Sequence, residues 1–298
     1  MRPHGWSGAT GDSPVSRRSE NLVTRTGNIP FIGPLLNKAR IAVRIAPLVA
    51  AAFPSDPLPA SRVAPFSVGA CADLSDPTDE ALYRGFAESA GGSEEVIRQH
   101  RELFIPVTRE AAVATKGMPI VDVGCGRGEF LGLMRIAGVE AFGVDTSECL
   151  GERLREEGHR VQTEDAVTFL ESTPDRSLGG VVCFNVVEHM DSFYFLRFLR
   201  LTARKVAPGG CVILGTSNPE CPFEMGVFWL DLTHVRPYHH ATCACYLSQL
   251  GFGSVRTVFY DPAPIPLRTS NDGSSPYRAY AVVGVRSLPK GTVGAGAM

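Results

Sequence analysis

The chain has 298 residues, of which 44% are hydrophobic, and its formal net charge at pH 7 is −2. This length and apolar content suffice for one large α/β domain with smaller additions. A nearly neutral chain has no global field that would recruit nucleic acid, so no nucleic-acid partner is expected. Most of the eight cysteines stand in apolar runs, where cysteine packs as a small hydrophobe, and residues 1–20 lack the apolar core of a secretory signal. These features predict a reduced, cytoplasmic protein.

Residues 1–65 are predicted to precede the catalytic part of the chain. Residues 1–27 are rich in Ser, Gly, Arg and Thr and are predicted to be disordered. Residues 29–53 are apolar, but they contain Lys38, Arg40 and Arg44 and are interrupted by Pro34 and Pro47, which argues against a membrane-spanning helix. A helix that touches the inner membrane face and a helix packed on its own domain both remain open. The prolines of residues 54–65 predict a stiff linker, and residues 289–298 are expected to form a flexible tail.

Residues 66–118 are predicted to form a helical extension. Asp79–Glu88 is one expected helix and Ser93–Lys116 is another. Ser93, followed by two glutamates, has the side chain of a good N-terminal cap for the longer helix.

A buried strand at Ile120–Val123 is followed by Gly124, Gly126 and Gly128, which predict a tight turn that opens a helix. Asp145 closes the next apolar strand, where a βαβ nucleotide site holds a ribose diol. The dinucleotide fingerprint needs its third glycine one residue later than Gly128. Asp122, in the strand that leads into the turn, would also repel a diphosphate. The acid therefore favours a cationic ligand.

Strands and helices alternate after this turn, which predicts a doubly wound α/β fold for residues 119–288 with a seven-stranded, mostly parallel sheet. The expected helices are Glu129–Ala137, Ser147–Glu157, Ala166–Glu171, Asp191–Val206 and Ala241–Leu250. The expected strands are Ile120–Val123, Ala141–Asp145, Arg160–Thr163, Gly179–Phe184, Cys211–Thr216, Val255–Tyr260 and Tyr277–Val285. Ala207-Pro208-Gly209-Gly210 is expected to end the fourth helix before its strand.

An acid followed by Gly-x-Gly-x-Gly, with a second acid closing the next strand, resembles the Rossmann-like class I S-adenosylmethionine-dependent methyltransferases. The resemblance implies S-adenosylmethionine as cofactor, an antiparallel last strand, and helices of residues 66–118 that cover the cofactor as a lid, with residues 82–86 as the aromatic and basic part. It also implies that Asp165 bonds the adenine amino group, while an N-cap role for Asp165 is equally compatible. The cofactor-binding residues expected on this basis are Asp122, Gly124, Gly126, Gly128, Asp145, Asp165 and Asn185.

Two further segments, Val-Val-Glu-His at 186–189 and Phe-Trp-x-Asp-x-Thr-His-Val-Arg-Pro at 228–237, resemble the methyltransferase domain of bacterial O-antigen chain-terminating and related cell-surface polysaccharide methyltransferases. The resemblance covers residues 80–252 and implies a sugar, glycan or glycan phosphate as acceptor. The chain departs from that pattern at Leu232, where the family often has proline. Other readings are a methyltransferase of a small natural product, a metal-assisted RNA 2′-O-methyltransferase, and a non-catalytic regulatory or membrane-docked partner.

His189, His234 and Arg236 are the candidate catalytic residues. His189 follows the fourth strand, and His234 and Arg236 lie in residues 218–240, an expected irregular loop that would shape the acceptor pocket. The two histidines are expected to flank the methyl group, and one of them to act as general base for a hydroxyl; the alternative is a histidine that only bonds backbone. A phosphate acceptor would need no base and would depend on Arg236 instead.

No metal site is expected from the sequence. Cysteines and histidines crowd residues 221–245, but without the Cys-x-x-Cys spacing of zinc sites. Asn185-x-x-Glu188-His189 is similar to the Glu-x-x-Glu-His metal site of small-RNA methyltransferases, yet its first ligand is missing.

Overall fold

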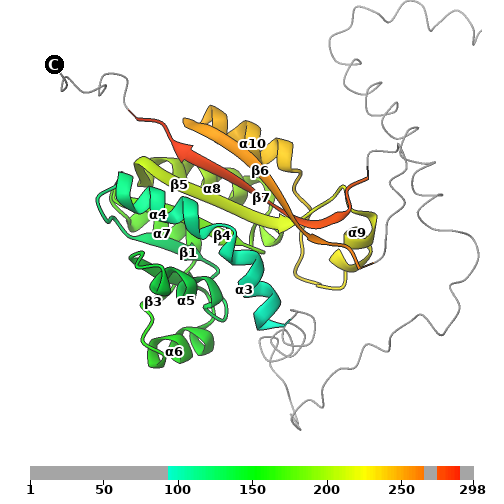
Figure 1. Ribbon diagram of the computed structural model, residues 1–298, viewed down its shortest axis with the longest axis horizontal. Helices are drawn as coiled ribbons and strands as arrows, with labels where there is room; N and C mark the ends of the chain where they lie inside the picture. Colours follow the sequence, from blue (N-terminus) through cyan, green and yellow to red (C-terminus); the bar gives the residue numbers. More distant parts are fainter. Residues whose placement is uncertain (1–92, 265–273, 289–298) are drawn as a thin grey trace, which may run out of the picture. The chain divides into compact units, whose positions relative to one another are not determined.

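The computed structural model describes residues 93–264 and 274–288 (Figure 1). The predictions for residues 1–65, for the helix Asp79–Glu88, for the lid segment 82–86 and for residues 289–298 lie outside this range. No helix among the described residues is both long and apolar enough to cross a bilayer.

Seven strands form one sheet in the order β3-β2-β1-β4-β5-β7-β6. β1 to β5 run parallel, and β7 is antiparallel to both β5 and β6. This confirms the predicted doubly wound fold with an antiparallel last strand. The strands are β1 (Ile120–Val123), β2 (Ala141–Asp145), β3 (Val161–Thr163), β4 (Leu178–Phe184), β5 (Val206–Ser217), β6 (Phe252–Pro262) and β7 (Tyr277–Arg286).

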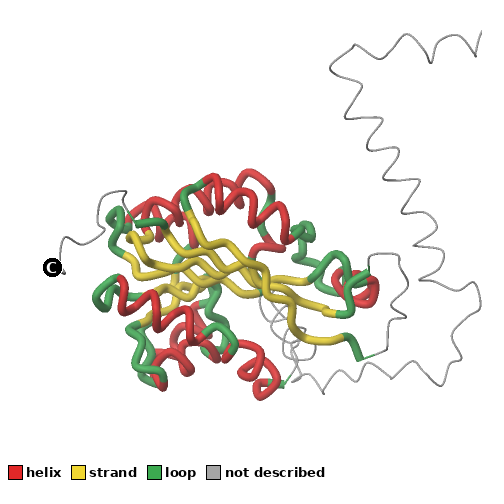
Figure 2. Tube along the Cα trace, turned by 45° about the horizontal axis from the view of Figure 1, so that its top comes forward, coloured by secondary structure: helices red, strands yellow, loops and turns green. Residues whose placement is uncertain are grey.

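Helices cover both faces of the sheet (Figure 2). Alternate residues of the central strands point to opposite faces, so that Val181 packs with α7, α8 and α10, whereas Val182 packs with α4, α5 and α6. Burial on both faces explains why these strands are continuous apolar runs. Within the described residues the α-helices are α3 (Glu94–Glu102), α4 (Ile105–Ala114), α5 (Glu129–Ile136), α6 (Glu148–Glu156), α7 (Ala166–Ser172), α8 (Ser192–Lys205), α9 (Pro222–Phe228) and α10 (His240–Gln249).

The prediction of one helix over Ser93–Lys116 is wrong. Ser93 does cap α3, because its Oγ accepts the Val96 N–H, but the chain breaks at 103–104 and restarts as α4. Pro106, in the first turn of α4, has no N–H to donate and a fixed φ that suits a helix start. The break lets α3 and α4 follow different directions.

Two other local expectations also need correction. Residues 207–210 do end α8, but they are already part of β5, whose pairing with β4 shifts register between Leu178 and Gly180. Residues 218–240 are not wholly irregular, because Pro222–Phe228 forms α9.

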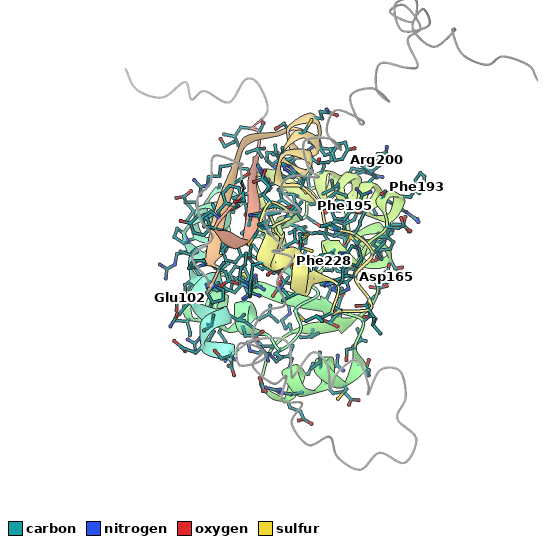
Figure 3. All side chains as sticks on the ribbon, turned by 90° about the vertical axis from the view of Figure 1, so that its right-hand side faces the viewer. Glu102, Asp165, Phe193, Phe195, Arg200 and Phe228 are labelled. Carbon is teal, nitrogen blue, oxygen red and sulfur yellow. The ribbon has the colours of Figure 1, made fainter. Side chains whose placement is uncertain are left out.

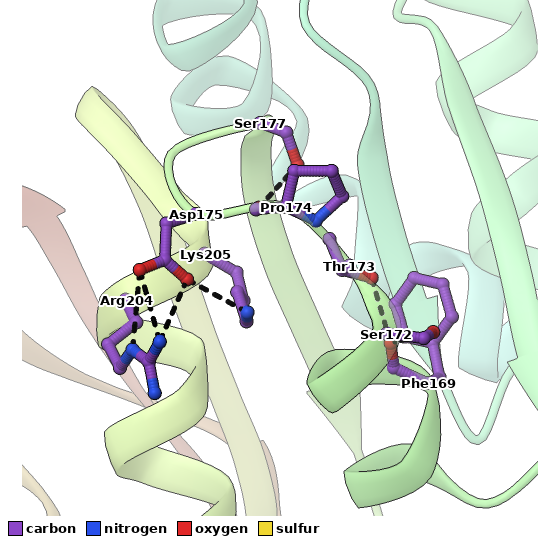
Figure 4. Close-up of polar contacts among 8 residues, drawn as sticks. All are labelled: Phe169, Ser172, Thr173, Pro174, Asp175, Ser177, Arg204 and Lys205. Carbon is purple, nitrogen blue, oxygen red and sulfur yellow. Dashed lines mark hydrogen bonds and ion pairs between the residues drawn. The ribbon is translucent and has the colours of Figure 1, made fainter.

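Ion pairs fasten the edge of the sheet where β4 begins. Asp175, just before β4, accepts from Lys205 Nζ at 2.8 Å and from the Arg204 guanidinium, both at the end of α8 (Figure 4). Partly exposed pairs of this kind contribute little to stability. They lie at the amino ends of the strands. The candidate site lies at the opposite, carboxyl ends.

Candidate active site

A cavity of about 820 Å³ opens at the carboxyl ends of the parallel strands. Its walls come from the segments that follow β1, β2, β3 and β4, from helix α3, and from Thr233. The strand order reverses between β1 and β4, and ligands of doubly wound sheets bind at this switch point. The volume falls within the range typical of small-molecule and cofactor sites.

The glycine-rich turn after β1 forms one wall of the cavity. Gly124, Gly126 and Gly128 have φ values of 66°, 51° and 82°, which L side chains rarely adopt. A Cβ on Gly124 would come within 2.2 Å of Val186 Cγ2, and one on Gly128 within 2.4 Å of Leu154 Cδ2. A Cβ on Gly126 would meet nothing closer than 4.0 Å. Two of the three glycines are therefore required by packing as well as by backbone conformation.

Asp122 contributes a buried carboxyl group to the cavity wall and is only 3% exposed. Burial raises its pKa to about 7, Arg101 opposes this shift, and Glu129 and Asp145 reinforce it. A cation bound in the cavity would favour the ionised form and lower this pKa.

Asp145 has a structural role that the sequence did not reveal. Its Oδ2 accepts the Gly126 N–H at 2.9 Å, and its Oδ1 accepts the Ser147 N–H at 3.0 Å. The carboxylate thus ties the glycine-rich turn to the start of α6 while it lines the cavity. A carboxylate can accept further hydrogen bonds on both oxygens, so this role is compatible with binding a ligand.

Asp165 caps α7 and also lines the cavity. Its Oδ1 accepts the N–H groups of Val167 and Thr168, both at 3.0 Å, and its Oδ2 accepts the Tyr194 hydroxyl. Burial opposes ionisation, but the hydrogen bonds from Tyr194 and Thr168 outweigh it and lower the pKa of Asp165. Asp165 therefore acts as the N-cap of α7, and it also lines the cavity.

Asn185 follows β4 and has a φ of 54°, in the left-handed region. The short 3₁₀ helix Val187–His189 follows, and it places Asn185 and His189 on the cavity while Glu188 points into the interior, where it is 1% exposed. Burial raises the pKa of Glu188 to about 7, although the nearby Thr216 hydroxyl and Arg101 oppose this. Neither Glu188 Oε2 nor Thr216 Oγ1 makes a well-formed hydrogen bond within the described residues.

His189 and His234 lie together, with 4.7 Å between their ring centroids. His189 lines the cavity, whereas His234 does not and packs on Phe228, with 4.3 Å between the ring centroids. His234 Nδ1 donates to the Phe228 carbonyl at 2.6 Å. Burial, and then the neighbouring His234, lower the pKa of His189 despite the opposing charge of Asp231. His189 is consequently neutral at neutral pH, as a general base must be.

Arg236 is not among the residues that line the cavity. Its Nη1 donates to Ser192 Oγ at 2.7 Å, which ties the loop to the start of α8. Phe193, the next residue of α8, projects from the surface, while Phe195 lies in the core (Figure 3).

Arg101 and Ile97 of α3 line the cavity, and neither was singled out from the sequence. The Arg101 guanidinium lies 3.7 Å from the centroid of the Phe184 ring and interacts with the charge of Asp122. Their spacing of four residues on a capped amphipathic helix was the available signal, because such residues share one helix face.

Two groups of potential metal ligands occur among the described residues, and neither contains a cysteine. One comprises His189, Asp231 and His234, and the other Glu220, His239 and His240; within each group the ligand atoms lie within 4.8 Å of one another. In the second group His239 Nδ1 accepts the Ala241 N–H and Nε2 faces Glu220 Oε1 at 3.0 Å, so a proton on Nε2 satisfies that contact.

The methyltransferase domain family matches residues 96–255, which is more than half of the chain. Among solved structures, the chain is similar to an S-adenosylmethionine-dependent methyltransferase from Archaeoglobus fulgidus, with 28% identity, a TM-score of 0.60, and coverage of 68% of this chain and 99% of that one. It also matches the magnesium protoporphyrin IX methyltransferase of Synechocystis with bound SAH, at 16% identity, a TM-score of 0.46, and coverage of 71% and 89%. No match was found among curated protein sequences. The chain belongs to the methyltransferase domain family and is an S-adenosylmethionine-dependent methyltransferase.

Proposed function

We propose that this methyltransferase acts in the cytoplasm and methylates an oxygen of a sugar, glycan or glycan phosphate during synthesis of a cell-surface polysaccharide. The observation that carries the proposal is the placement of a neutral histidine, His189, on the cavity wall beside the segment 228–237 whose sequence resembles polysaccharide methyltransferases.

The cofactor, S-adenosylmethionine, supplies an electrophilic methyl group on a sulfonium. Asp122 and the glycine-rich turn would hold its methionine end, with Arg101 as the cation for its carboxylate. Asp145 would accept hydrogen bonds from the ribose, and Asp165 and Asn185 would lie near the adenine and the reacting end. Most of the rate enhancement would then come from positioning the acceptor in line with the methyl group.

For a hydroxyl acceptor, His189 would remove the proton as the oxygen attacks the methyl group. His234 packs against the ring of His189 and does not itself line the cavity. For a glycan phosphate the attacking oxygen is already ionised, and Arg236 would bind the phosphate.

The test measures methyl transfer from labelled S-adenosylmethionine to a panel of methyl glycosides, nucleotide sugars and glycosyl phosphates. His189→Gln should reduce turnover of a hydroxyl acceptor by about 10²–10⁴-fold with cofactor affinity unchanged, and His234→Gln should reduce it less. Full activity of both variants would reject general-base catalysis. A loss confined to Arg236→Lys would then favour the phosphate acceptor, because lysine keeps the charge but not the bidentate geometry.

One observation favours a second candidate, a small natural product with an apolar part. The loop beside Thr233 exposes Trp229, Leu230, Leu232 and Val235, with Leu232 96% exposed. An apolar acceptor would cover these side chains, whereas a simple sugar would not. Leu232→Ser should raise KM for an apolar acceptor and leave KM for a nucleotide sugar unchanged.

A further inference from the structure

The loop after α9 contacts His189 through a chain of two hydrogen bonds. Thr233 Oγ1 lies 2.9 Å from His189 Nδ1 and 2.6 Å from Asp231 Oδ1. The Thr233 N–H donates to the same Asp231 oxygen at 2.8 Å. Thr233 also lines the cavity beside His189, so the contact occurs at the candidate reaction centre.

The direction of these hydrogen bonds follows from the number of protons available. Burial opposes ionisation of Asp231, but the hydrogen bonds from the Thr233 hydroxyl and N–H lower its pKa, so its carboxylate is ionised and only accepts. The single Thr233 hydroxyl proton therefore points to Asp231, at the shorter of the two distances. The hydroxyl oxygen must then accept from His189, which places the histidine proton on Nδ1.

A neutral imidazole carries one proton, so a proton on Nδ1 leaves Nε2 as the basic nitrogen. His234 has the same arrangement, since its Nδ1 donates to the Phe228 carbonyl at 2.6 Å. Of the two rings, only His189 lines the cavity.

We propose that Asp231 and Thr233 are positioning residues that fix His189 in the tautomer with a proton on Nδ1, so that Nε2 can accept the proton of the acceptor hydroxyl. This inference rests on the proposed role of His189 as general base. It gives Asp231 and Thr233, which belong to the segment resembling polysaccharide methyltransferases, a function in the reaction without contact to the methyl group. In serine proteases an aspartate that orients a catalytic histidine has the same effect on the tautomer.

The tautomer can be measured in the full-length protein by ¹⁵N NMR of labelled histidine, without an acceptor. The chain has seven histidines, so His189→Gln identifies the His189 signals by their loss. In the wild type, Nδ1 of His189 should be protonated and Nε2 unprotonated. Thr233→Ser keeps the hydroxyl and should keep this pattern, whereas Thr233→Val removes the acceptor and should give a mixture of tautomers.

Asp231→Asn tests the other end of the hydrogen-bond chain that runs from Asp231 through Thr233 to His189, here called the relay. The asparagine amide can donate to Thr233 Oγ1, which releases the hydroxyl proton toward His189 Nδ1 and favours a proton on Nε2. Both Thr233→Val and Asp231→Asn should lower kcat for a hydroxyl acceptor by about 10–10²-fold, with S-adenosylmethionine affinity unchanged and activity retained in Thr233→Ser.

Three results would overturn the inference: a wild-type His189 protonated on Nε2, an unchanged tautomer in a folded Thr233→Val variant, or equal loss of activity in the Ser and Val variants. A fourth test measures activity with a chelator and the histidine ¹⁵N spectrum with Zn²⁺, because His189, Asp231 and His234 could together bind a divalent cation. A change in the ¹⁵N shifts of both histidines on adding Zn²⁺, together with chelator-sensitive activity, would make Asp231 a ligand and reject the relay. Failure of the proposed function is separate, since full activity of His189→Gln removes the base whatever tautomer is observed.

Discussion

The raised pKa of Asp122 should make cofactor binding depend on pH near neutrality. S-adenosylmethionine carries a sulfonium and an ammonium group, so the ionised form of this carboxyl binds it better than the protonated form. With a pKa of about 7 in the free protein, roughly 90% of Asp122 is ionised at pH 8 and roughly 10% at pH 6. If the bound cation keeps Asp122 ionised throughout, the affinity should fall by about tenfold from pH 8 to pH 6, or about 1.4 kcal/mol.

Calorimetric titration at pH 6, 7 and 8 measures this slope. Repeating the pH 7 titration in buffers of different ionisation enthalpy should show release of about half a proton per cofactor bound, because half of Asp122 is protonated before binding. Asp122→Asn should bind more weakly at pH 8 and lose the slope. Arg101→Met removes the cation that lowers this pKa, so the midpoint should move to higher pH.

Glu188→Gln is the matched control. Burial also raises the pKa of Glu188 to about 7, but this side chain is in the interior and does not line the cavity. The variant should keep the pH dependence of binding. Equal wild-type affinity at pH 6 and pH 8, or a slope that persists in Asp122→Asn, would refute the role assigned to Asp122.

Three further predictions concern stability and the cavity wall. Because the folded-state pKa of Glu188 lies above its usual 4.5, its contribution to stability is lost as pH rises toward 7; Glu188→Gln should therefore be roughly 1–3 kcal/mol more stable than the wild type at pH 8 and similar at pH 4.5, by chemical denaturation. Gly124→Ala should lower the free energy of unfolding by about 2–4 kcal/mol and Gly126→Ala by about 1–2 kcal/mol, since only the first Cβ overlaps a neighbour. Asp145→Ala should weaken S-adenosylmethionine binding by about 1.5–3 kcal/mol in a sheet that stays folded; unchanged affinity would remove Asp145 from the site.

The sheet was predictable from the sequence because its central parallel strands, such as β1 and β4, are buried on both faces and appear as short apolar runs between helices. The glycine-rich turn was predictable for a related reason, since positive φ values at alternate positions demand glycine. The position of Arg101 was not predictable, because its place on the cavity wall depends on the break between α3 and α4. A single proline in a helical pattern does not show where a helix will turn.

The segment after β4 shows a second limit. Alternation along a strand gives no guide once Asn185 adopts a left-handed conformation and the chain enters a 3₁₀ helix. That geometry separates adjacent residues, with Glu188 in the interior and His189 on the cavity. The hydrogen-bond chain from Asp231 was equally hidden, because its Thr233–His189 contact joins residues 44 positions apart.

The position of Asp122 bears on how the product leaves the enzyme. In the proposed binding mode, methyl transfer removes the sulfonium charge, so the product S-adenosylhomocysteine has one positive charge fewer beside the Asp122 carboxylate. The favourable interaction that kept Asp122 ionised then weakens, and its pKa should return part of the way toward about 7. We therefore expect the affinity for S-adenosylhomocysteine to change less than that for S-adenosylmethionine between pH 8 and pH 6, in parallel calorimetric titrations. Identical slopes for the two ligands would show that Asp122 responds to the ammonium group alone, and that loss of the sulfonium charge does not assist product release.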